Sequence, residues 1–240
     1  MTMLEFKERY PSLQKVVFNS TLNDPRPCLT GARMIAIKNG LPTTQIETSA
    51  SSLNEDLNFF TSVEDAVNAL ELGSPYIAVK AGRYLFMNND EERAMMAFGQ
   101  ARNMLLRHSA YPGDQSWQEA FSLALTTGLD EERESMYKQL LKNPGDDMEH
   151  IRTASFVRGL MTPSIKAKEM LSEGNDKLSL ARYLAHNYYY RSALSLYQKS
   201  MGMIYNLPPK EAVQHLLETI HCIRGVGSFI PFSSSLRAAA

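Results

Sequence analysis

The sequence predicts a mostly α-helical protein, a stack of antiparallel helical hairpins that follows a small N-terminal region of irregular or α+β structure. Three observations predict this fold class. Residues 74–107 have the pattern of two helices joined at Asn88-Asn89, with small side chains alternating with bulky ones. Residues 178–201 repeat that pattern 99 positions later, which is three steps of 33. Beyond Gly73, helix-ending Gly, Pro and Asn recur between the apolar segments.

The two segments place similar side chains at equivalent helical positions. Small residues let neighbouring helix backbones approach closely, and the large residues fill the space between them. We therefore expect both sets to pack between helices. They are Ala81, Gly82, Leu85, Ala94, Phe98 and Ala101 in the first segment, and Leu180, Ala181, Leu184, Ala193 and Tyr197 in the second.

This pattern resembles the tetratricopeptide-repeat family, which favours a small residue on the first helix and a small-then-aromatic pair on the second. The resemblance implies a right-handed stack of about four to five hairpins with a concave surface that binds peptides. Residues 117–141 match less well, because Arg133 occupies the small-residue position, and residues 148–171 match poorly. A helical repeat of another kind and a helical bundle remain open alternatives.

The chain divides into three parts: an N-terminal region (1–52) of mixed or irregular structure, a helical-repeat domain (53–224), and a flexible or clipped-on tail (225–240). Residues 15–18 have a β-like composition, and residues 30–39 suit either a short buried helix or a strand. Residues 43–52 are polar, with many hydroxyl groups, so we expect a solvated connector there. In the later part, Thr162-Pro163 predicts the start of a new helix.

Composition and charge exclude several classes of protein. With 25 Lys+Arg against 26 Asp+Glu, the net charge of −1 provides no general attraction to nucleic acid or anionic lipid. The two cysteines lie almost at opposite ends of the sequence and form no disulfide framework, which fits a reducing compartment. The sequence has no apolar run of membrane-spanning length and no secretory signal. We expect a cytoplasmic protein that inserts in no membrane.

A candidate partner-binding cluster lies in HNYYYR, near a predicted helix–helix turn: His186, Tyr188, Tyr189 and Tyr190. Tyrosine offers a partner a large rigid surface with a polar tip at modest entropic cost. Core packing is the competing interpretation for some of them, because successive helical residues point in different directions.

A candidate metal stripe lies on the last predicted helix, where Glu211, His215, Glu218 and Cys222 follow i, i+4, i+7, i+11 spacing. The stripe appears on the side opposite Val213, Leu217 and Ile220, so a solvated polar face explains it equally well. The sequence lacks both HExxH and CxxC spacing. We expect no metal and no other cofactor.

The predicted function is a non-enzymatic adaptor or scaffold subunit, which binds other protein subunits or a peptide segment within a larger cytoplasmic assembly. The family resemblance further implies a chaperone-like or accessory component of a secretion or transport machine. The sequence has no phosphate-binding glycine loop, no GxSxG motif and no catalytic motif around a cysteine. The alternative is an enzyme or sensor with a site between the N-terminal region and the first hairpin, where Cys28, Arg33 and Lys38 are the candidates.

Overall fold

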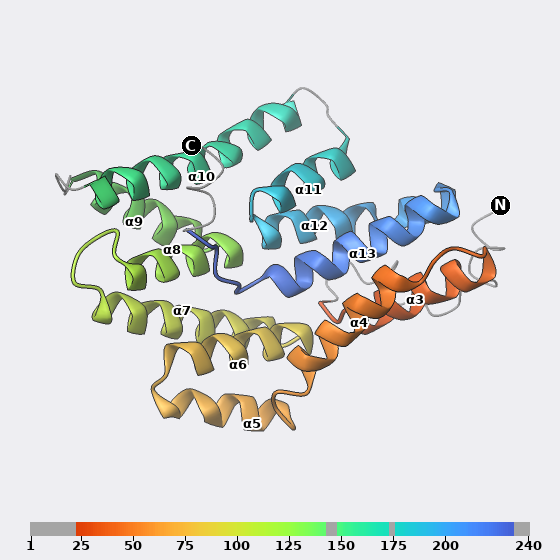
Figure 1. Cartoon of the computed structure of the whole chain (residues 1–240), viewed down its shortest axis with the longest axis horizontal. Coiled ribbons are helices and arrows are strands. Elements are labelled where there is room, and N and C mark those ends of the chain that lie inside the picture. Colours follow the sequence, from red (N-terminus) through yellow and green to blue (C-terminus); the bar gives the residue numbers. More distant parts are fainter. Residues whose placement is uncertain (1–22, 143–147, 173–175, 233–240) are drawn as a thin grey trace.

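The computed structural model describes residues 23–142, 148–172 and 176–232, and these residues form helices joined by turns and short loops, with no strand among them (Figure 1). The predicted mostly helical fold is confirmed. Helix labels follow Figure 1. The helices are α3 (Arg26–Lys38), α4 (Thr44–Leu57), α5 (Val63–Asn68), η2 (Ala69–Leu72), α6 (Pro75–Met87), α7 (Glu91–His108), α8 (Gln115–Thr127), α9 (Asp130–Lys142), α10 (Met148–Ser172), α11 (Lys177–His186), α12 (Tyr190–Ser200), η3 (Met201–Asn206) and α13 (Pro209–Gly225).

The hairpins α6–α7 and α11–α12, which the sequence places 99 positions apart, have the same turn. In each, an asparagine amide donates to a carbonyl four residues earlier at 2.8 Å, from Asn88 to Tyr84 and from Asn187 to Tyr183. The next residue is left-handed in both, with φ of 64° at Asn89 and 67° at Tyr188. The following N–H groups then donate back at 2.9 Å, from Asp90 to the carbonyl of Leu85 and from Tyr189 to that of Leu184.

Two further helices, α3 and α8, end with this Schellman turn. Their left-handed residues are Gly40, with φ 63°, and Gly128, with φ 71°. The same backward hydrogen bond, again 2.9 Å long, joins Leu41 to Ala36 and Leu129 to Ala124. The same turn geometry therefore reverses the chain at four places. The sequence pattern had indicated a repeat at only two of them, the α6–α7 and α11–α12 hairpins.

The predicted packing residues are buried in both hairpins. Gly82 shows why a small residue is needed there: a Cβ atom at this position would lie 2.7 Å from the ring of Phe98 on α7. Phe98 is fully buried. The α6 and α7 backbones therefore approach as closely as the sequence pattern predicts, while the relation to the tetratricopeptide family stays a prediction.

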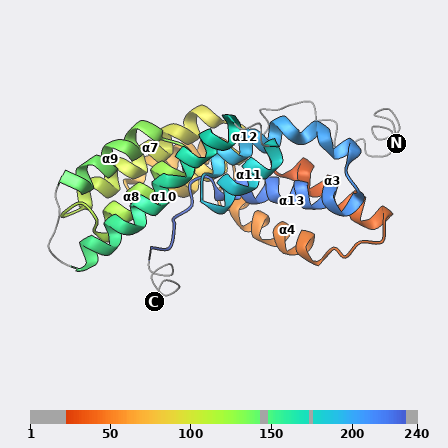
Figure 2. The same ribbon diagram turned by 90° about the horizontal axis from the view of Figure 1, so that it is seen from above.

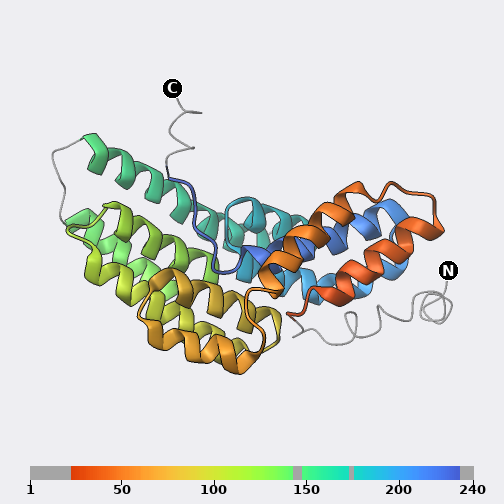
Figure 3. The same ribbon diagram turned by 60° about the horizontal axis from the view of Figure 1, so that its bottom comes forward.

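Successive helices lie beside one another, and the last helix, α13, returns to pack against α3 and α4 near the other end of the described chain (Figures 1 and 3). Seen from above, α13 lies close to both α3 and α4 (Figure 2). Apolar side chains of α3, η3 and α13, together with Ile46 of α4, form one core cluster, and the hairpins α5 to α12 form a larger one. Helix α13 contributes to both clusters, so it connects them.

The described part of the N-terminal region is helical, which corrects the prediction of a solvated connector at residues 43–52. These residues lie in α4, where Ile46, Ala50 and Leu53 are buried. Their i, i+4, i+7 spacing forms an apolar stripe, and packing of this stripe outweighs the weak helix propensity of the Ser and Thr residues around it. The boundary at residue 52 therefore falls inside a helix. The β-like run at 15–18 lies outside the described residues.

Two C-terminal predictions are also resolved. Helix α10 continues through Pro163, so the predicted break at Thr162-Pro163 is wrong. The loss of one backbone donor is not enough to divide this helix, whose side chains pack before and after the proline.

Residues 226–232 pack against the core: Val226 and Ile230 are buried, and Thr126 of α8 donates to the carbonyl of Ser228 at 3.2 Å. Residues 233–240 lie outside the described residues.

The end of α4 is attached to two other helices through Asp56. Its carboxylate accepts hydrogen bonds from Arg83 of α6 at 3.0 Å and from Arg224 of α13 at 3.1 Å. All three side chains are mostly shielded from solvent. Burial lowers the pKa of Arg83 despite the nearby carboxylate. Asp56 therefore sets the position of α4 relative to both helices.

We expect Asp56→Asn to destabilise the protein by about 1–3 kcal/mol, because two partly buried arginines lose their shared counter-charge. The neighbouring exposed residue provides the matched control, Glu55→Gln, which should change stability by less than about 0.5 kcal/mol. Urea unfolding followed by circular dichroism measures both values. Equal losses in the two variants would show that Asp56 does not hold α4 in place.

A glycine-to-alanine pair tests the close approach of α6 and α7. Gly82→Ala should destabilise by about 1–3 kcal/mol, because its methyl group would press against Phe98. Gly99→Ala, where an added Cβ meets nothing within 4 Å, should instead stabilise helix α7 by about 0.5–1 kcal/mol. Thermal and urea unfolding report both changes, and a stabilising Gly82→Ala would contradict the packing.

Candidate functional site

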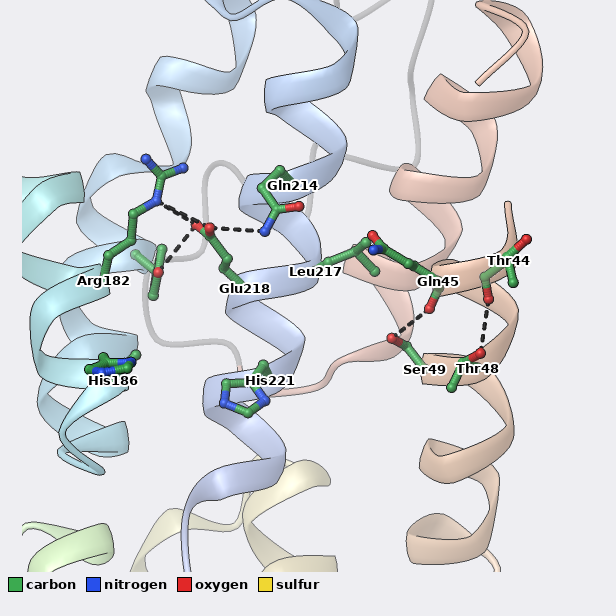
Figure 4. Close-up of a pocket in the computed structure, with 12 residues that line it drawn as sticks. Thr44, Gln45, Thr48, Ser49, Arg182, His186, Gln214, Leu217, Glu218 and His221 are labelled. Atoms are coloured by element: carbon green, nitrogen blue, oxygen red, sulfur yellow. Dashed lines mark hydrogen bonds and ion pairs between the residues drawn. The ribbon is translucent and has the colours of Figure 1, made fainter. Parts of the chain in front are cut away.

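A groove of ≈ 780 Å³ lies where α4, α11 and α13 meet (Figure 4). Its size is within the range of roughly 300–1,000 Å³ that is usual for ligand sites. Helix α13 runs between the other two helices, so it forms the floor, and α4 and α11 form the walls (Figure 4). The lining residues are Thr44, Gln45, Thr48 and Ser49 of α4, Arg182, Ala185 and His186 of α11, Tyr197 of α12, and Gln214, Leu217, Glu218 and His221 of α13.

Helical periodicity explains how each element presents these side chains. On α13, residues 214, 217, 218 and 221 follow i, i+3, i+4, i+7 spacing, which places them on one face. On α4, residues 44, 45, 48 and 49 form a similar stripe on the side away from buried Ile46 and Leu53. The groove is therefore the space that a further segment, lying along α13, would fill.

Glu218 is the centre of the polar network in the groove. Its carboxylate accepts from Arg182 Nε at 3.1 and 3.0 Å, from the Tyr197 hydroxyl at 3.2 Å and from Gln214 Nε2 at 3.0 Å. Burial, and then the charge of Glu218, raises the pKa of Tyr197, so its hydroxyl remains a donor at neutral pH. These contacts hold the side chains from α11, α12 and α13 in a fixed arrangement.

Several donors in the groove have no hydrogen-bond partner within the described part of the chain. Arg182 uses Nε on Glu218, and its two terminal nitrogens point away from that carboxylate (Figure 4). The imidazoles of His186 and His221 also line the space. Burial, and then the charge of Arg224, lowers the pKa of His221.

The α4 wall is polar, but its hydroxyl groups are already used as donors. Thr48 Oγ1 donates to the carbonyl of Thr44 at 3.0 Å, and Ser49 Oγ donates to that of Gln45 at 2.9 Å. Thr48 and Ser49 line the groove, as does Gln45, which is exposed. This wall therefore offers sites that suit the amide and carbonyl groups of a peptide.

The predicted partner-binding cluster is divided by the structure. His186 is exposed and lines the groove, and Tyr188 is half-buried. Tyr189 is 3% exposed, and its hydroxyl donates to the carbonyl of Leu160 at 2.7 Å. Tyr190 is 8% exposed and its ring lies against Gly225, where a Cβ atom would come within 2.5 Å of it. Tyr189 and Tyr190 therefore pack in the core, and a direct partner contact stays a prediction for His186 and Tyr188.

The candidate metal stripe on α13 does not form one surface. Glu211 is exposed, whereas His215 and Cys222 are fully buried. The alternative of a solvated polar face is also wrong for these two residues, because both side chains are buried, His215 beside Tyr197 of α12. Within the described residues, no three His, Cys, Asp or Glu side chains are grouped in a way that would hold a metal ion.

The structure also places the three residues that were candidates for the enzyme alternative. Cys28 is 2% exposed in the α3–α13 core, and burial raises its pKa to about 12, so its thiol is not a reactive nucleophile at neutral pH. Arg33 pairs with Glu47 through two hydrogen bonds of 3.0 and 2.6 Å. Lys38 is exposed in the last turn of α3. None of these three residues lines the groove between α4, α11 and α13.

Sequence reasoning missed most of the groove. It named His186 as a partner-binding candidate, Glu218 as a candidate metal ligand and Tyr197 as a packing residue, without bringing the three together. The available signal was the second stripe of α13, at Gln214, Leu217, Glu218 and His221, which shares Glu218 with the candidate metal stripe. The α4 wall was missed because its polar composition predicted a connector rather than a helix.

His215 makes the stability of the fold depend on pH. Its ring is fully buried beside Tyr197, with centroids 5.4 Å apart, and neither nitrogen makes a hydrogen bond of ordinary geometry to the described residues. Burial lowers the pKa of His215 from 6.5 to about 4, an effect that Glu218 and the nearby carbonyl of Tyr197 offset only in part. The folded protein therefore keeps this imidazole neutral in mildly acidic solution.

The unfolded chain protonates His215 near pH 6.5, whereas the folded chain does so only near pH 4. Above pH 6.5 the residue is neutral in both states and does not affect stability. As the pH falls below 6.5, proton binding increasingly stabilises the unfolded chain, so the folded protein loses stability. We expect this residue to account for a loss of about 2 kcal/mol between pH 7.5 and pH 5. His215→Leu should remove that part of the pH dependence, and exposed His186→Gln should keep it. Urea unfolding at both pH values tests this, and an unchanged pH dependence in His215→Leu would contradict it.

Within the described residues, no helix is both long and apolar enough to cross a membrane. Comparison of the chain with protein-family models, with curated proteins and with solved structures gave no match. The groove between α4, α11 and α13 therefore has to be interpreted from its own geometry.

Proposed function

We propose that this protein is a non-enzymatic adaptor or scaffold subunit, and that the groove between α4, α11 and α13 holds a peptide segment of its protein partner. The observation that carries the proposal is the groove itself, in which α4, α11 and α13, with Tyr197 of α12, line one space and Glu218 accepts hydrogen bonds from Arg182 of α11 and Tyr197 of α12. A partner segment placed there would bury surface on all three helices at once. Such multiple contacts favour binding of one segment over many alternatives.

The lining chemistry suits a peptide. Leu217 provides an apolar contact on the floor, and the amides of Gln45 and Gln214 lie on opposite sides of it (Figure 4). Amide side chains can donate to and accept from a peptide backbone, and a few well-placed polar groups within an apolar surface fix the orientation of a ligand. Because these side chains come from helices, their positions are already set before the partner arrives.

The resemblance to tetratricopeptide repeats adds a further expectation. It suggests a chaperone-like or accessory subunit of a secretion or transport machine in the cytoplasm, and this part of the proposal rests on that resemblance alone. The rival class is an enzyme or sensor. The buried thiol of Cys28 weakens the catalytic version of this rival, and a stable small-molecule ligand would favour the sensor version.

Site-specific photocrosslinking in lysate from the source cells tests the adaptor function. A benzophenone amino acid at Thr48, in the groove, should give a discrete adduct with one protein, whereas the same group at exposed Glu64 on α5 should not. Gln214→Trp fills the groove and should abolish the adduct. Lys210→Trp, at an exposed position one turn earlier on α13, should preserve it.

Two outcomes would contradict the proposal. One is the absence of any adduct specific to Thr48, and the other is an adduct that persists in Gln214→Trp as strongly as in Lys210→Trp. Circular dichroism of both tryptophan variants shows whether each remains folded. Native mass spectrometry of the purified chain distinguishes the sensor alternative, since a bound metabolite would add a defined mass.

A further inference from the structure

We infer that the groove is selective for acidic peptide segments, with Arg182 binding a carboxylate of the partner. This inference rests on the proposed peptide-binding function and specifies the chemistry of the partner. It comes from the balance of charged donors and acceptors in the groove rather than from its shape.

The charged acceptor that lines the groove already accepts hydrogen bonds from the protein itself. Glu218 is the single acidic residue among the lining side chains, and it accepts hydrogen bonds from Arg182, Tyr197 and Gln214. A basic ligand would have to compete with these three donors for the same carboxylate. An unpaired ammonium or guanidinium group held beside Arg182 would also be repelled by it. The groove therefore disfavours basic segments.

The charged donor of the groove is only partly used. Arg182 pairs with Glu218 through Nε, and no hydrogen bond to a described residue engages its terminal nitrogens. Its side chain is 46% exposed, and those nitrogens point away from Glu218 (Figure 4). Because Glu218 already orients the guanidinium plane, a partner carboxylate can bind its free edge with little further loss of side-chain freedom.

The other charged and titratable groups near Arg182 are also compatible with an acidic ligand. Asp176, at the start of α11, is the other acid that affects Arg182, but its carboxylate caps the helix: it accepts from the N–H groups of Leu178 at 2.9 Å and Ser179 at 3.1 Å and from the Ser179 hydroxyl at 2.6 Å. The other titratable groups that line the space are His186, His221 and the neutral hydroxyl of Tyr197.

A peptide fits these features better than a nucleic acid does. The groove has one arginine, surrounded by amides, hydroxyls and Leu217, whereas binding to a phosphate backbone draws on several cations along a surface. The net charge of −1 provides no general attraction to polyanions. An acidic peptide would place one carboxylate on Arg182 and its neighbouring backbone groups on the side-chain amides of Gln45 and Gln214. These contacts match the number and kind of binding groups in the groove.

Selection from a random octapeptide library displayed on phage, against the purified full chain, tests the inference without knowledge of the natural partner. The wild type should enrich peptides that contain Asp or Glu. Arg182→Gln should lose this enrichment, and Arg107→Gln, which removes an exposed arginine on α7 outside the groove, should keep it. A synthetic copy of the most enriched peptide then allows affinity to be measured by fluorescence polarisation.

The synthetic acidic peptide should bind at least about tenfold more tightly than its Gln-substituted copy, and Arg182→Gln should remove that difference. Selection of peptides without acidic residues, equal binding of the acidic and Gln-substituted copies, or an equal effect of Arg182→Gln and Arg107→Gln would overturn the inference. A single-stranded oligonucleotide that displaces the peptide more effectively than an equally charged acidic peptide would do so as well. The crosslinking experiment at Thr48 is independent of partner charge, so an adduct there combined with no acidic selection would reject the acidic specificity while retaining the adaptor function.

Discussion

The arrangement of this protein depends on the burial of helix α13 along most of its surface. Residues on several sides of α13, among them Val213, His215, Ile220 and Cys222, are shielded by other parts of the chain. Packing against α3 on one side and α12 on another brings helices from the two ends of the described chain into one body. A helix buried on so many sides cannot shift without exposing apolar surface on several neighbours, so it provides a rigid reference for the elements around it.

The groove follows from this central position. Because α13 is covered by α3 on one side, the face that carries Gln214, Leu217 and Glu218 is left between the separated helices α4 and α11. Asp56 holds the end of α4 by its contacts with Arg83 and Arg224, and Glu218 holds Arg182 of α11. The same contacts that stabilise the junction therefore fix the distance between the two walls of the proposed peptide site.

Repetition in the hairpins has a local physical origin. A helix that ends in an Asn or Gly with positive φ, followed by a backward hydrogen bond, returns the chain at a fixed angle, and small residues such as Gly82 then allow the second helix to pack closely. At Tyr188 the left-handed conformation is taken by an aromatic residue, for which it is unfavourable. Packing on both sides of the turn, including buried Tyr189 and Tyr190, is strong enough to impose it.

The sequence by itself determined the helical class, the two matched hairpins and the burial of their packing residues, because helix periodicity and the placement of small side chains are local properties. It also contained the stripe on α13, but it could not show which face of that helix meets solvent. Only the tertiary structure decided that His215 and Cys222 are buried, that residues 44–57 are a helix, and that Arg182, Gln45 and Gln214 share one groove. These outcomes depend on contacts between different helices, such as those of α3 and α4 with α13 and that of His215 with Tyr197 of α12, which no local pattern records.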